Sequence, residues 1–225
     1  MEPVSGTQSR LRERKKLETR QALSRAALRL TVERGLENIR VEDIAAEANV
    51  SPRTFNNYFS SKLEAICAIA TDRAEQIGAT LRRRPAAEPL WEAITAAVLE
   101  HYEGAGEAPD AEWMQRLGAV LASPPLQGEY LRVTAAMQRS LAQAIADRLG
   151  TDLDQDMLPM ILGGAVTAAT QVALRRWFDS SPARPLRPLL ALALRQLASA
   201  FAKDPAPVQG AVVLPHEAGE GPARR

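Results

Sequence analysis

The chain has 225 residues, of which 46% are hydrophobic and 24% charged, so it can build a core and is not globally disordered. Its single cysteine, Cys67, excludes an internal disulfide and favours a reducing cytoplasm. Residues 1–84 carry 16 Lys and Arg against 11 Asp and Glu, whereas residues 85–225 carry 12 against 16. This imbalance indicates a polyanionic partner for the first part only, although random surface charge explains the same counts equally well.

Apolar residues recur at helical spacing throughout, and no stretch alternates as a strand does, so we expect an all-α fold of about nine helices. The N-terminus has no apolar signal region and charged or polar residues interrupt the longest apolar runs, so we expect a cytoplasmic protein without a membrane span. Residues 1–9 are expected to be disordered. A first helix is predicted from about Ser9 to Arg34, and Gly35 supplies the left-handed stop that helix ends favour.

A second, short helix is predicted over 41–48, followed by Asn49, which tolerates the positive φ of a tight turn. Ser51 is a favourable N-cap and Pro52 suits the first helical position, so a third helix should begin there and end near Phe59. The segment Ser61–Glu64 has the pattern of a capping box, which predicts a fourth helix running to about Leu81.

Five further helices are predicted in the rest of the chain, over residues 88–104, 111–122, 125–149, 155–179 and 185–203. The tail from 205 to 225 is rich in Pro, Gly and Ala and is expected to be unstructured. This organisation divides the chain into an N-terminal helix-turn-helix domain, residues 10–66, and a second helical domain, residues 67–204.

The third predicted helix carries the clearest functional signal. Phe55 and Phe59 share one face, and the other face carries polar residues suited to DNA: Arg53, Thr54, Asn56, Asn57 and Tyr58. Arg and Asn make bidentate hydrogen bonds to guanine and adenine edges. Asn and Tyr are poor helix formers, so a merely solvated face would favour other residues. The pattern therefore favours a helix that reads the major groove over a plain helical hairpin.

The segment from Arg20 to Ile66 resembles the DNA-binding domain of the tetracycline-repressor (TetR) family. The resemblance rests on R-x-A-L-x-x-A-A-L-x-L from Arg20 to Leu30, on Gly35, and on VEDIAAEANVSPRTFNNYFSSK over 41–62. The run SPRTFNNYFSSK is also similar to actinobacterial members resembling the mycofactocin-cluster regulators. The resemblance implies a DNA-binding transcriptional regulator, most often a ligand-responsive repressor that binds a palindromic operator as a homodimer.

Three positions depart from the pattern that is frequent in the family. Arg40 stands where Thr often caps the second helix, Asn49 where Gly is frequent, and Asn56 where a bulky aromatic is frequent. Arg40 cannot cap as Thr does, but Asp43 can close half of a capping box. Because Asn56 adds an amide near the groove or the scaffold, the base preference should not be assumed from that of relatives.

By resemblance, base or nearby phosphate contacts fall to Arg53, Thr54 and Asn57, with Asn56 near the groove or the scaffold, and backbone contacts to Arg40, Tyr58 and Lys62. The basic run Arg10, Arg12, Arg14, Lys15 and Lys16 is either a flexible arm that follows an adjacent groove or a solvated helix end.

The last two predicted helices are apolar on nearly every side, over residues 157–177 and 186–201. Such helices must be buried all round, and a second subunit can cover their outer faces. We therefore expect a homodimer through helices 155–179 and 185–203, with Gly163, Gly164, Ala165 and Ala168 allowing close approach. A fully buried central helix in a monomer is the alternative.

Aromatic, histidine and methionine side chains in the second half are candidates for a ligand pocket, although such residues more often form plain core. The candidates are Trp91, His101, Tyr102, Trp113, Met114, Met137 and Met160. Because few of these candidates are charged, they would suit an apolar or amphipathic effector better than a highly charged one.

An enzyme is the first rival function. Cys67 and the two histidines, His101 and His216, make no nucleophile–base pattern, and no phosphate loop or metal-spaced cluster is present, so we expect no catalytic residues, cofactor or metal. A helical protein–protein adaptor without specific DNA binding is the second rival, and a TetR-like activator the third.

Overall fold

The structure is a computed structural model that describes residues 5–102, 111–179 and 185–202. Throughout these ranges the secondary structure is helical, with no strand, which confirms the expected all-α fold. The helices, with one short 3₁₀ helix η1, are α1 (Ser5–Arg34), η1 (Leu36–Asn38), α2 (Val41–Glu47), α3 (Pro52–Asn56), α4 (Lys62–Arg83), α5 (Leu90–Glu100), α6 (Ala111–Leu121), α7 (Pro124–Leu149), α8 (Leu158–Phe178) and α9 (Leu186–Ala202).

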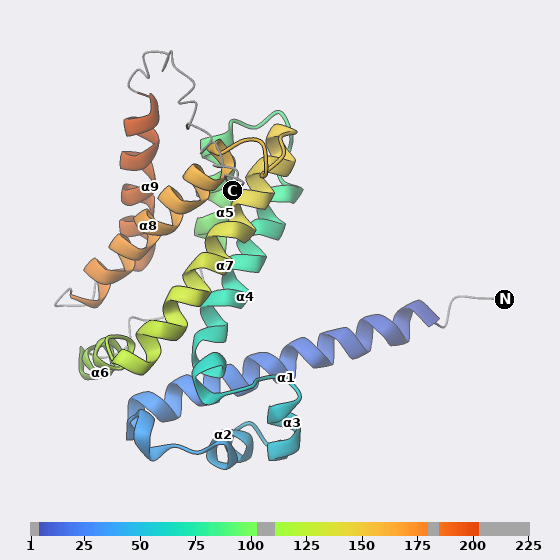
Figure 1. The fold of residues 1–225 in the computed structure, drawn as a ribbon, viewed down its shortest axis with the longest axis vertical. Helices are drawn as coiled ribbons and strands as arrows, with labels where there is room; N and C mark the ends of the chain where they lie inside the picture. Colours follow the sequence, from blue (N-terminus) through green and yellow to red (C-terminus); the bar gives the residue numbers. More distant parts are fainter. Residues whose placement is uncertain (1–4, 103–110, 180–184, 203–225) are drawn as a thin grey trace, which may run out of the picture.

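The helices form two connected groups (Figure 1). Helices α1, α2 and α3 lie together at one end of the molecule, and α1 extends well beyond α3. Helices α4, α5, α7, α8 and α9 form a bundle at the other end, with α4 and α7 side by side and α8 packed between α7 and α9. Helix α4 runs without a break from the first group into the second, so it crosses the domain boundary predicted at residues 66 and 67.

The first group is held by what we call the N-terminal cluster, in which apolar faces of α1 to α4 meet. Among its largest fully buried members are Leu23, Leu30, Ile39, Ile44, Phe55 and Phe59. Two residues of α7, Leu126 and Val133, are buried in the same cluster. The N-terminal part of α7 is therefore part of the core on which the helix-turn-helix rests.

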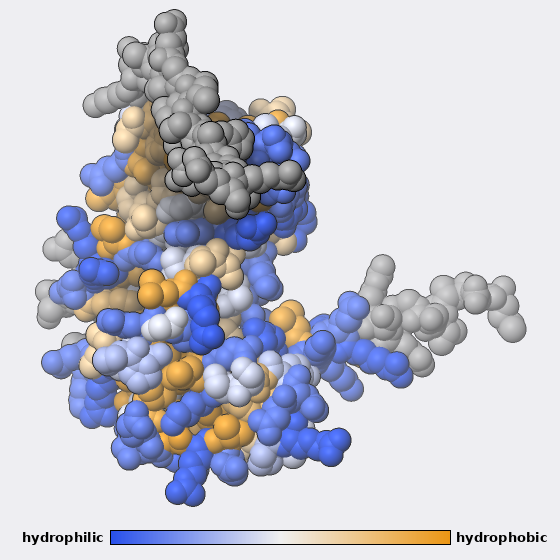
Figure 2. Space-filling model, viewed as in Figure 1, coloured by the Kyte–Doolittle hydropathy of each residue, from blue (hydrophilic) through white to orange (hydrophobic). Residues whose placement is uncertain are grey.

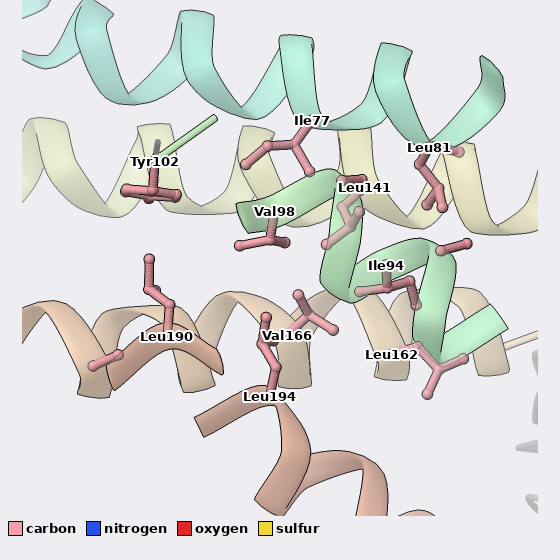
Figure 3. Close-up of a cluster of buried hydrophobic side chains, with 14 of the residues drawn as sticks. Ile77, Leu81, Ile94, Val98, Tyr102, Leu141, Leu162, Val166, Leu190 and Leu194 are labelled. Atoms are coloured by element: carbon pink, nitrogen blue, oxygen red, sulfur yellow. The ribbon is translucent and has the colours of Figure 1, made fainter. Parts of the chain in front are cut away.

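The bundle is held by a second core, the C-terminal cluster, to which α4, α5, α7, α8 and α9 all contribute. Figure 3 shows side chains from these helices pointing toward a common centre. They include Ile77 and Leu81, Ile94 and Val98, Leu141, Leu162 and Val166, and Leu190 and Leu194.

Two glycines allow close packing on α7. A Cβ atom on Gly163 would lie 2.8 Å from the carbonyl oxygen of Gln138, which is closer than real Cβ contacts, so α8 can approach α7 only with glycine there. A Cβ on Gly78 of α4 would lie 3.3 Å from Oγ of Ser140. Gly163 therefore serves packing inside the subunit, not the contact between subunits for which the sequence suggested it.

Several helix ends differ from the predicted ones. Helix α1 begins at Ser5, so residues 5–9 are helical and not disordered as expected. Helix α5 ends at Glu100, earlier than the predicted 104. Helix α8 begins at Leu158 and not at 155, because the Asp156 carboxylate accepts the backbone N–H of Leu158 at 2.9 Å and turns the chain there. The tail 205–225 lies outside the described residues.

By length and composition, α8 is long and apolar enough to span a membrane, the one such helix in the described ranges. In the structure it packs in the bundle and contributes Leu162 and Val166 to the C-terminal cluster. The same composition is found in the core helix of a soluble bundle, so this feature is weak evidence for a membrane span.

Candidate nucleic-acid interface

The turn between α2 and α3 has the backbone that its sequence predicts. Asn49 has φ of 56°, the only positive φ at a non-glycine residue in the described ranges. The N–H of Val50 then donates to the carbonyl of Ala45 at 2.9 Å, which closes the end of α2. Ser51 caps α3, because its Oγ accepts the N–H of Thr54 at 3.1 Å, and Pro52 occupies the first turn.

Helix α3 has one buried aromatic face and one exposed polar face. Phe55 and Phe59 are 1% and 2% exposed, and their ring centroids lie 5.7 Å apart. Arg53, Asn56 and Asn57 are exposed. The α-helix ends at Asn56, earlier than predicted, although the N–H of Phe59 still donates to the carbonyl of Phe55 at 3.0 Å.

The other two polar residues of this segment are only half-exposed. The hydroxyl of Thr54 lies 2.9 Å from that of Ser51, within the cap. Tyr58 packs at the border of the N-terminal cluster. The Arg53 side chain, by contrast, makes no hydrogen bond or ion pair with any residue that the structure describes. Its guanidinium is therefore available for an outside partner.

Arg40 occupies the N-cap position of α2 and is exposed. Its backbone N–H donates to the carboxylate of Asp43 at 2.8 Å, which is the half of a capping box that the sequence predicted. The Arg40 side chain makes no hydrogen bond in this cap.

Lys62, a predicted phosphate contact, has partners within the protein. Its Nζ donates to the carbonyl oxygens of Leu36 at 2.7 Å and Ile39 at 3.1 Å. The ammonium group therefore ties the start of α4 to the loop before α2. Because an ammonium has three donors, one N–H of Lys62 remains for a phosphate oxygen.

The start of α4 has a capping box shifted by one residue from its predicted form. The Ser61 Oγ accepts the N–H of Glu64 at 3.1 Å, as expected. The Glu64 carboxylate, however, accepts the backbone N–H and the hydroxyl of Ser60, both at 2.7 Å, and not the N–H of Ser61. The two serines before α4 are thereby tied to its first turn.

Arg20 of α1 connects three parts of this surface, a role that sequence reasoning did not identify. Its guanidinium lies 4.6 Å from the centroid of the Phe59 ring, and its Nε donates to the carboxylate of Asp72 on α4 at 3.0 Å. One Nη also lies 3.5 Å from the carbonyl oxygen of Tyr58. Arg20 thus fixes the end of the α3 segment against both α1 and α4.

The predicted pocket residues do not meet in one cavity. His101 shares a 2.7 Å hydrogen bond with Thr80, and Tyr102 is buried under the guanidinium of Arg73. Met137 packs on the N-terminal cluster and Met160 is 37% exposed on α8. The other three, Trp91, Trp113 and Met114, belong to the C-terminal cluster or its border. The residue types were compatible with a pocket, but their helices turn them in different directions.

A pocket of about 820 Å³ lies between α5 and α9, with Trp91 the only predicted candidate among its lining residues. The lining combines apolar side chains with both signs of charge and consists of Arg84, Glu88, Trp91, Glu92, Thr95, Ala96, Leu99, Glu100, Arg187, Arg195 and Ala198. Arg84 donates to Glu88 across the loop between α4 and α5, and this hydrogen bond lowers the pKa of the Glu88 carboxyl. The Arg148 guanidinium donates to the carbonyls of Arg84, Pro85 and Glu88 and so fixes the loop that forms one edge.

Both halves of the chain match known protein families. Residues 23–65 match the family described as bacterial regulatory proteins, tetR family. Residues 88–202 match the MftR C-terminal domain of the same class of regulators.

Two curated relatives align with most of the chain. The transcriptional regulator TcmR of Streptomyces glaucescens is 38% identical over 173 residues, which cover 75% of this chain and 76% of TcmR. MftR of Mycobacterium tuberculosis, whose name assigns it to the regulation of mycofactocin biosynthesis, is 23% identical over 73% of this chain and 82% of its own length.

Solved structures of TetR-family proteins share the fold. A protein from Syntrophomonas wolfei superimposes with a TM-score of 0.59 at 19% identity, covering 83% of this chain and 96% of its own. A second, from Rhodococcus sp., gives a TM-score of 0.50 at 20% identity over 80% and 98% of the two chains.

Proposed function

The chain belongs to the TetR family of bacterial regulatory proteins and is a DNA-binding transcriptional regulator; from this premise we propose that it is a ligand-responsive repressor that binds a palindromic operator as a homodimer. The observation that carries the proposal is the exposed polar face of α3, mounted on the buried Phe55–Phe59 pair. In this proposal, residues 10–66 bind DNA, and residues 67–204 bind the effector and the second subunit.

Base reading is assigned to the exposed side chains of α3. Arg53 has a free guanidinium and Asn57 an exposed amide, the two groups that recognise guanine and adenine edges in the major groove. Asn56 lies beside them and is exposed as well. Thr54, whose hydroxyl is shared with Ser51, is better placed for a phosphate or methyl contact than for selective hydrogen bonding.

Phosphate contacts are assigned to residues around α3. Arg40, at the exposed start of α2, has a guanidinium free of the cap that its backbone makes. Tyr58 and the third N–H of Lys62 extend this row. Because phosphate contacts fix register but carry no sequence information, these residues set affinity and α3 sets specificity.

Dimerisation is assigned to the outer faces of α8 and α9. Large apolar side chains are exposed there, among them Ile161 at 52% and Val172 at 56% on α8, and Leu192 at 42% on α9. Between Ile161 and Val172 the outward positions are small: Gly164, on which an added Cβ would meet nothing within 4 Å, and Ala168. A second copy of the same surface would cover this patch and pair the two recognition helices.

The effector is assigned to an amphipathic small molecule, with the pocket between α5 and α9 as the candidate site. Trp91 and Leu99 give that pocket an apolar wall, while Arg84, Glu92 and Arg195 give it charged edges. A ligand that binds one dimer conformation better than another changes operator affinity by linkage. A regulator of this kind acts where the DNA is, so we place it in the cytoplasm, where the free thiol of Cys67 is stable.

The test is a binding-site selection with the full-length protein and random duplex DNA. We expect an enriched palindrome whose half-sites lie about one helical turn, 34–36 Å, apart. A reporter driven by a promoter containing that palindrome should be silenced by the protein, whereas increased output would identify an activator. If no duplex sequence is enriched, the protein is not a sequence-specific regulator and the adaptor function replaces this proposal.

A further inference from the structure

Helix α1 is much longer than its packing requires. Its 30 residues span about 45 Å, yet residues 11–18 are exposed and burial begins only near Leu23. Figure 1 shows this N-terminal part of α1 projecting beyond α2 and α3, with no other described helix beside it. In Figure 2 its surface is mainly hydrophilic. The projection therefore contributes no core packing that explains it.

The helical phase of α1 gives this projection a defined basic face. The buried residues Leu23, Ala27 and Leu30 mark the face that packs on the N-terminal cluster. Continued backward in steps of three and four residues, the same face carries Thr19, then Lys16 and Lys15, then Arg12. Thus one face of α1 is apolar from Leu23 onward, where the helix is packed, and basic over residues 12–16, where it is exposed.

This basic face points to the side of the molecule on which α3 lies. Lys16 is one turn before Arg20, and Arg20 contacts the Phe59 ring and the Tyr58 carbonyl at the end of the α3 segment. The remaining charges of the projection flank the row or lie behind it, where Arg14 pairs with Glu18 at 3.2 Å. The face is therefore a row of three exposed cations, with Glu13, three residues before Lys16, as the carboxylate at its margin.

The row carries an electrostatic cost in the isolated protein. Like charges spaced three and four residues apart destabilise a helix by about 0.2–0.5 kcal/mol per pair. Arg12, Lys15 and Lys16 have this spacing and make no ion pair with a residue that the structure describes. A polyanion aligned with the helix would remove this repulsion.

We propose that Arg12, Lys15 and Lys16 form a second DNA-contacting surface, which binds backbone phosphates outside the base pairs read by α3. The proposal rests on the proposed function, since it assumes that α3 is in the major groove. From Arg20 to Arg12 the helix rises about 12 Å, so it extends the contact along the duplex by roughly three to four base pairs on each side of the operator. The sequence left open a flexible arm or a solvated helix end for this run, whereas here the contact is made by a helix; Arg10 lies outside the residues whose side chains are described.

The test compares two lengths of the selected operator duplex, one ending at the last sequence-specific base pair and one with six further base pairs on each side. The variant Arg12→Gln/Lys16→Gln removes two charges from the proposed face. The matched control, Arg14→Gln/Arg25→Gln, removes two exposed charges from the opposite side of α1 and has the same net charge. Circular dichroism checks that both variants remain folded.

We expect the wild type and the control to bind the long duplex more tightly than the short one, and the face variant to lose this difference. On the long duplex, the slope of log affinity against log salt should become less negative by about 3–4 for a dimer, since four phosphate contacts are removed. Equal binding of both lengths by the wild type, or an equal loss in the control, overturns the inference while leaving the proposed function intact. If the selection yields no operator, the proposed function fails and this inference fails with it.

Discussion

The guanidinium of Arg20 on α1 donates to the carboxylate of Asp72 on α4 across 3.0 Å, and the same guanidinium covers the Phe59 ring. The next residue on α4, Arg73, lies 4.4 Å from the centroid of the Tyr102 ring at the end of α5. Neighbouring residues of one helix thus contact the N-terminal helices on one side and the C-terminal bundle on the other. A shift of α4 would be felt at both contacts.

The Arg20–Asp72 pair should stabilise the protein and hold α3 in position. We expect Arg20→Gln and Asp72→Asn each to lower the free energy of unfolding by about 1–3 kcal/mol, because each leaves a partly buried charge without its partner. The double variant should be less destabilised than the sum of the two, with a coupling energy above about 0.5 kcal/mol in urea unfolding. Strict additivity would show that the two groups do not interact. Operator affinity should fall in all three variants without a change in the preferred sequence.

Lys62 should be needed for folding as well as for DNA binding. In Lys62→Met the carbonyls of Leu36 and Ile39 lose their donor, so the free energy of unfolding should fall by about 1–3 kcal/mol. Lys62→Arg keeps a cation and serves as the control, with a smaller loss expected. If thermal unfolding of Lys62→Met matches the wild type, the two hydrogen bonds do not stabilise the loop. The slope of affinity against salt, measured on the operator, reports the additional phosphate contact.

Substitutions in and next to α3 should distinguish residues that recognise bases from residues that bind the DNA backbone. Arg53→Ala and Asn57→Ala remove groups suited to base edges, so a repeated binding-site selection should return a relaxed or altered motif, with a cost of about 1–3 kcal/mol at the affected position. Tyr58→Phe should weaken binding to all sequences by a similar factor. The unchanged motif in both alanine variants would remove the base-reading assignment.

Dimerisation can be tested by introducing a single glutamate, either in the proposed interface on α8 or, as a control, on α7. Ile161→Glu places a carboxylate in the exposed apolar patch of α8 and should give a monomer with greatly reduced operator affinity, because a buried unpaired charge opposes association. Leu131→Glu, on α7, is a suitable control because Leu131 is 70% exposed and outside the proposed interface. Light scattering at micromolar concentration measures both. A dimeric Ile161→Glu variant would move the interface elsewhere.

The thiol of Cys67 should be unreactive in the folded protein. Burial, with a smaller contribution from Glu129, raises the pKa of Cys67 from 9.0 to about 11, so the thiolate is scarce at pH 8. Alkylation at pH 8 should therefore be slow in the native state and fast in urea. Because the folded state has the higher pKa, the contribution of Cys67 to stability is complete below pH 9 and is lost as the pH rises through about 11. Equal alkylation rates in both states would contradict its burial.

The parts of the interface that could be predicted from the sequence are those specified by neighbouring residues. Asn49, Ser51 and Pro52 act within a few positions of themselves, so their turn and cap were predictable, and so was the aromatic pair Phe55 and Phe59. Arg20 and Asp72 are 52 positions apart, and nothing in either local pattern indicates the other. The partners of Lys62 are backbone carbonyls, which have no sequence signature.

The pocket residues could not be predicted either, because the sequence does not specify which way each side chain faces in the bundle. Trp91 and Met137 have residue types compatible with a cavity, but the direction of each depends on how α5 and α7 are rotated in the bundle. Helical periodicity identifies an apolar face without identifying the helix that covers it. Likewise, Gly163 was correctly expected to permit a close approach, but the neighbour is Gln138 of the same chain.

Helix α7 contributes Leu126 and Val133 to the N-terminal cluster and Leu141 and Ile145 to the C-terminal cluster, so one rigid element belongs to both cores. The helix-turn-helix is therefore not a detachable module: excised at residue 66, it would lose the side chains that close its own core. Exchanging recognition helices between such regulators should succeed when only the exposed face of α3 is replaced. Exchanging the whole N-terminal half would succeed only if the α7 residues that it contacts, Leu126 and Val133, are exchanged together with it.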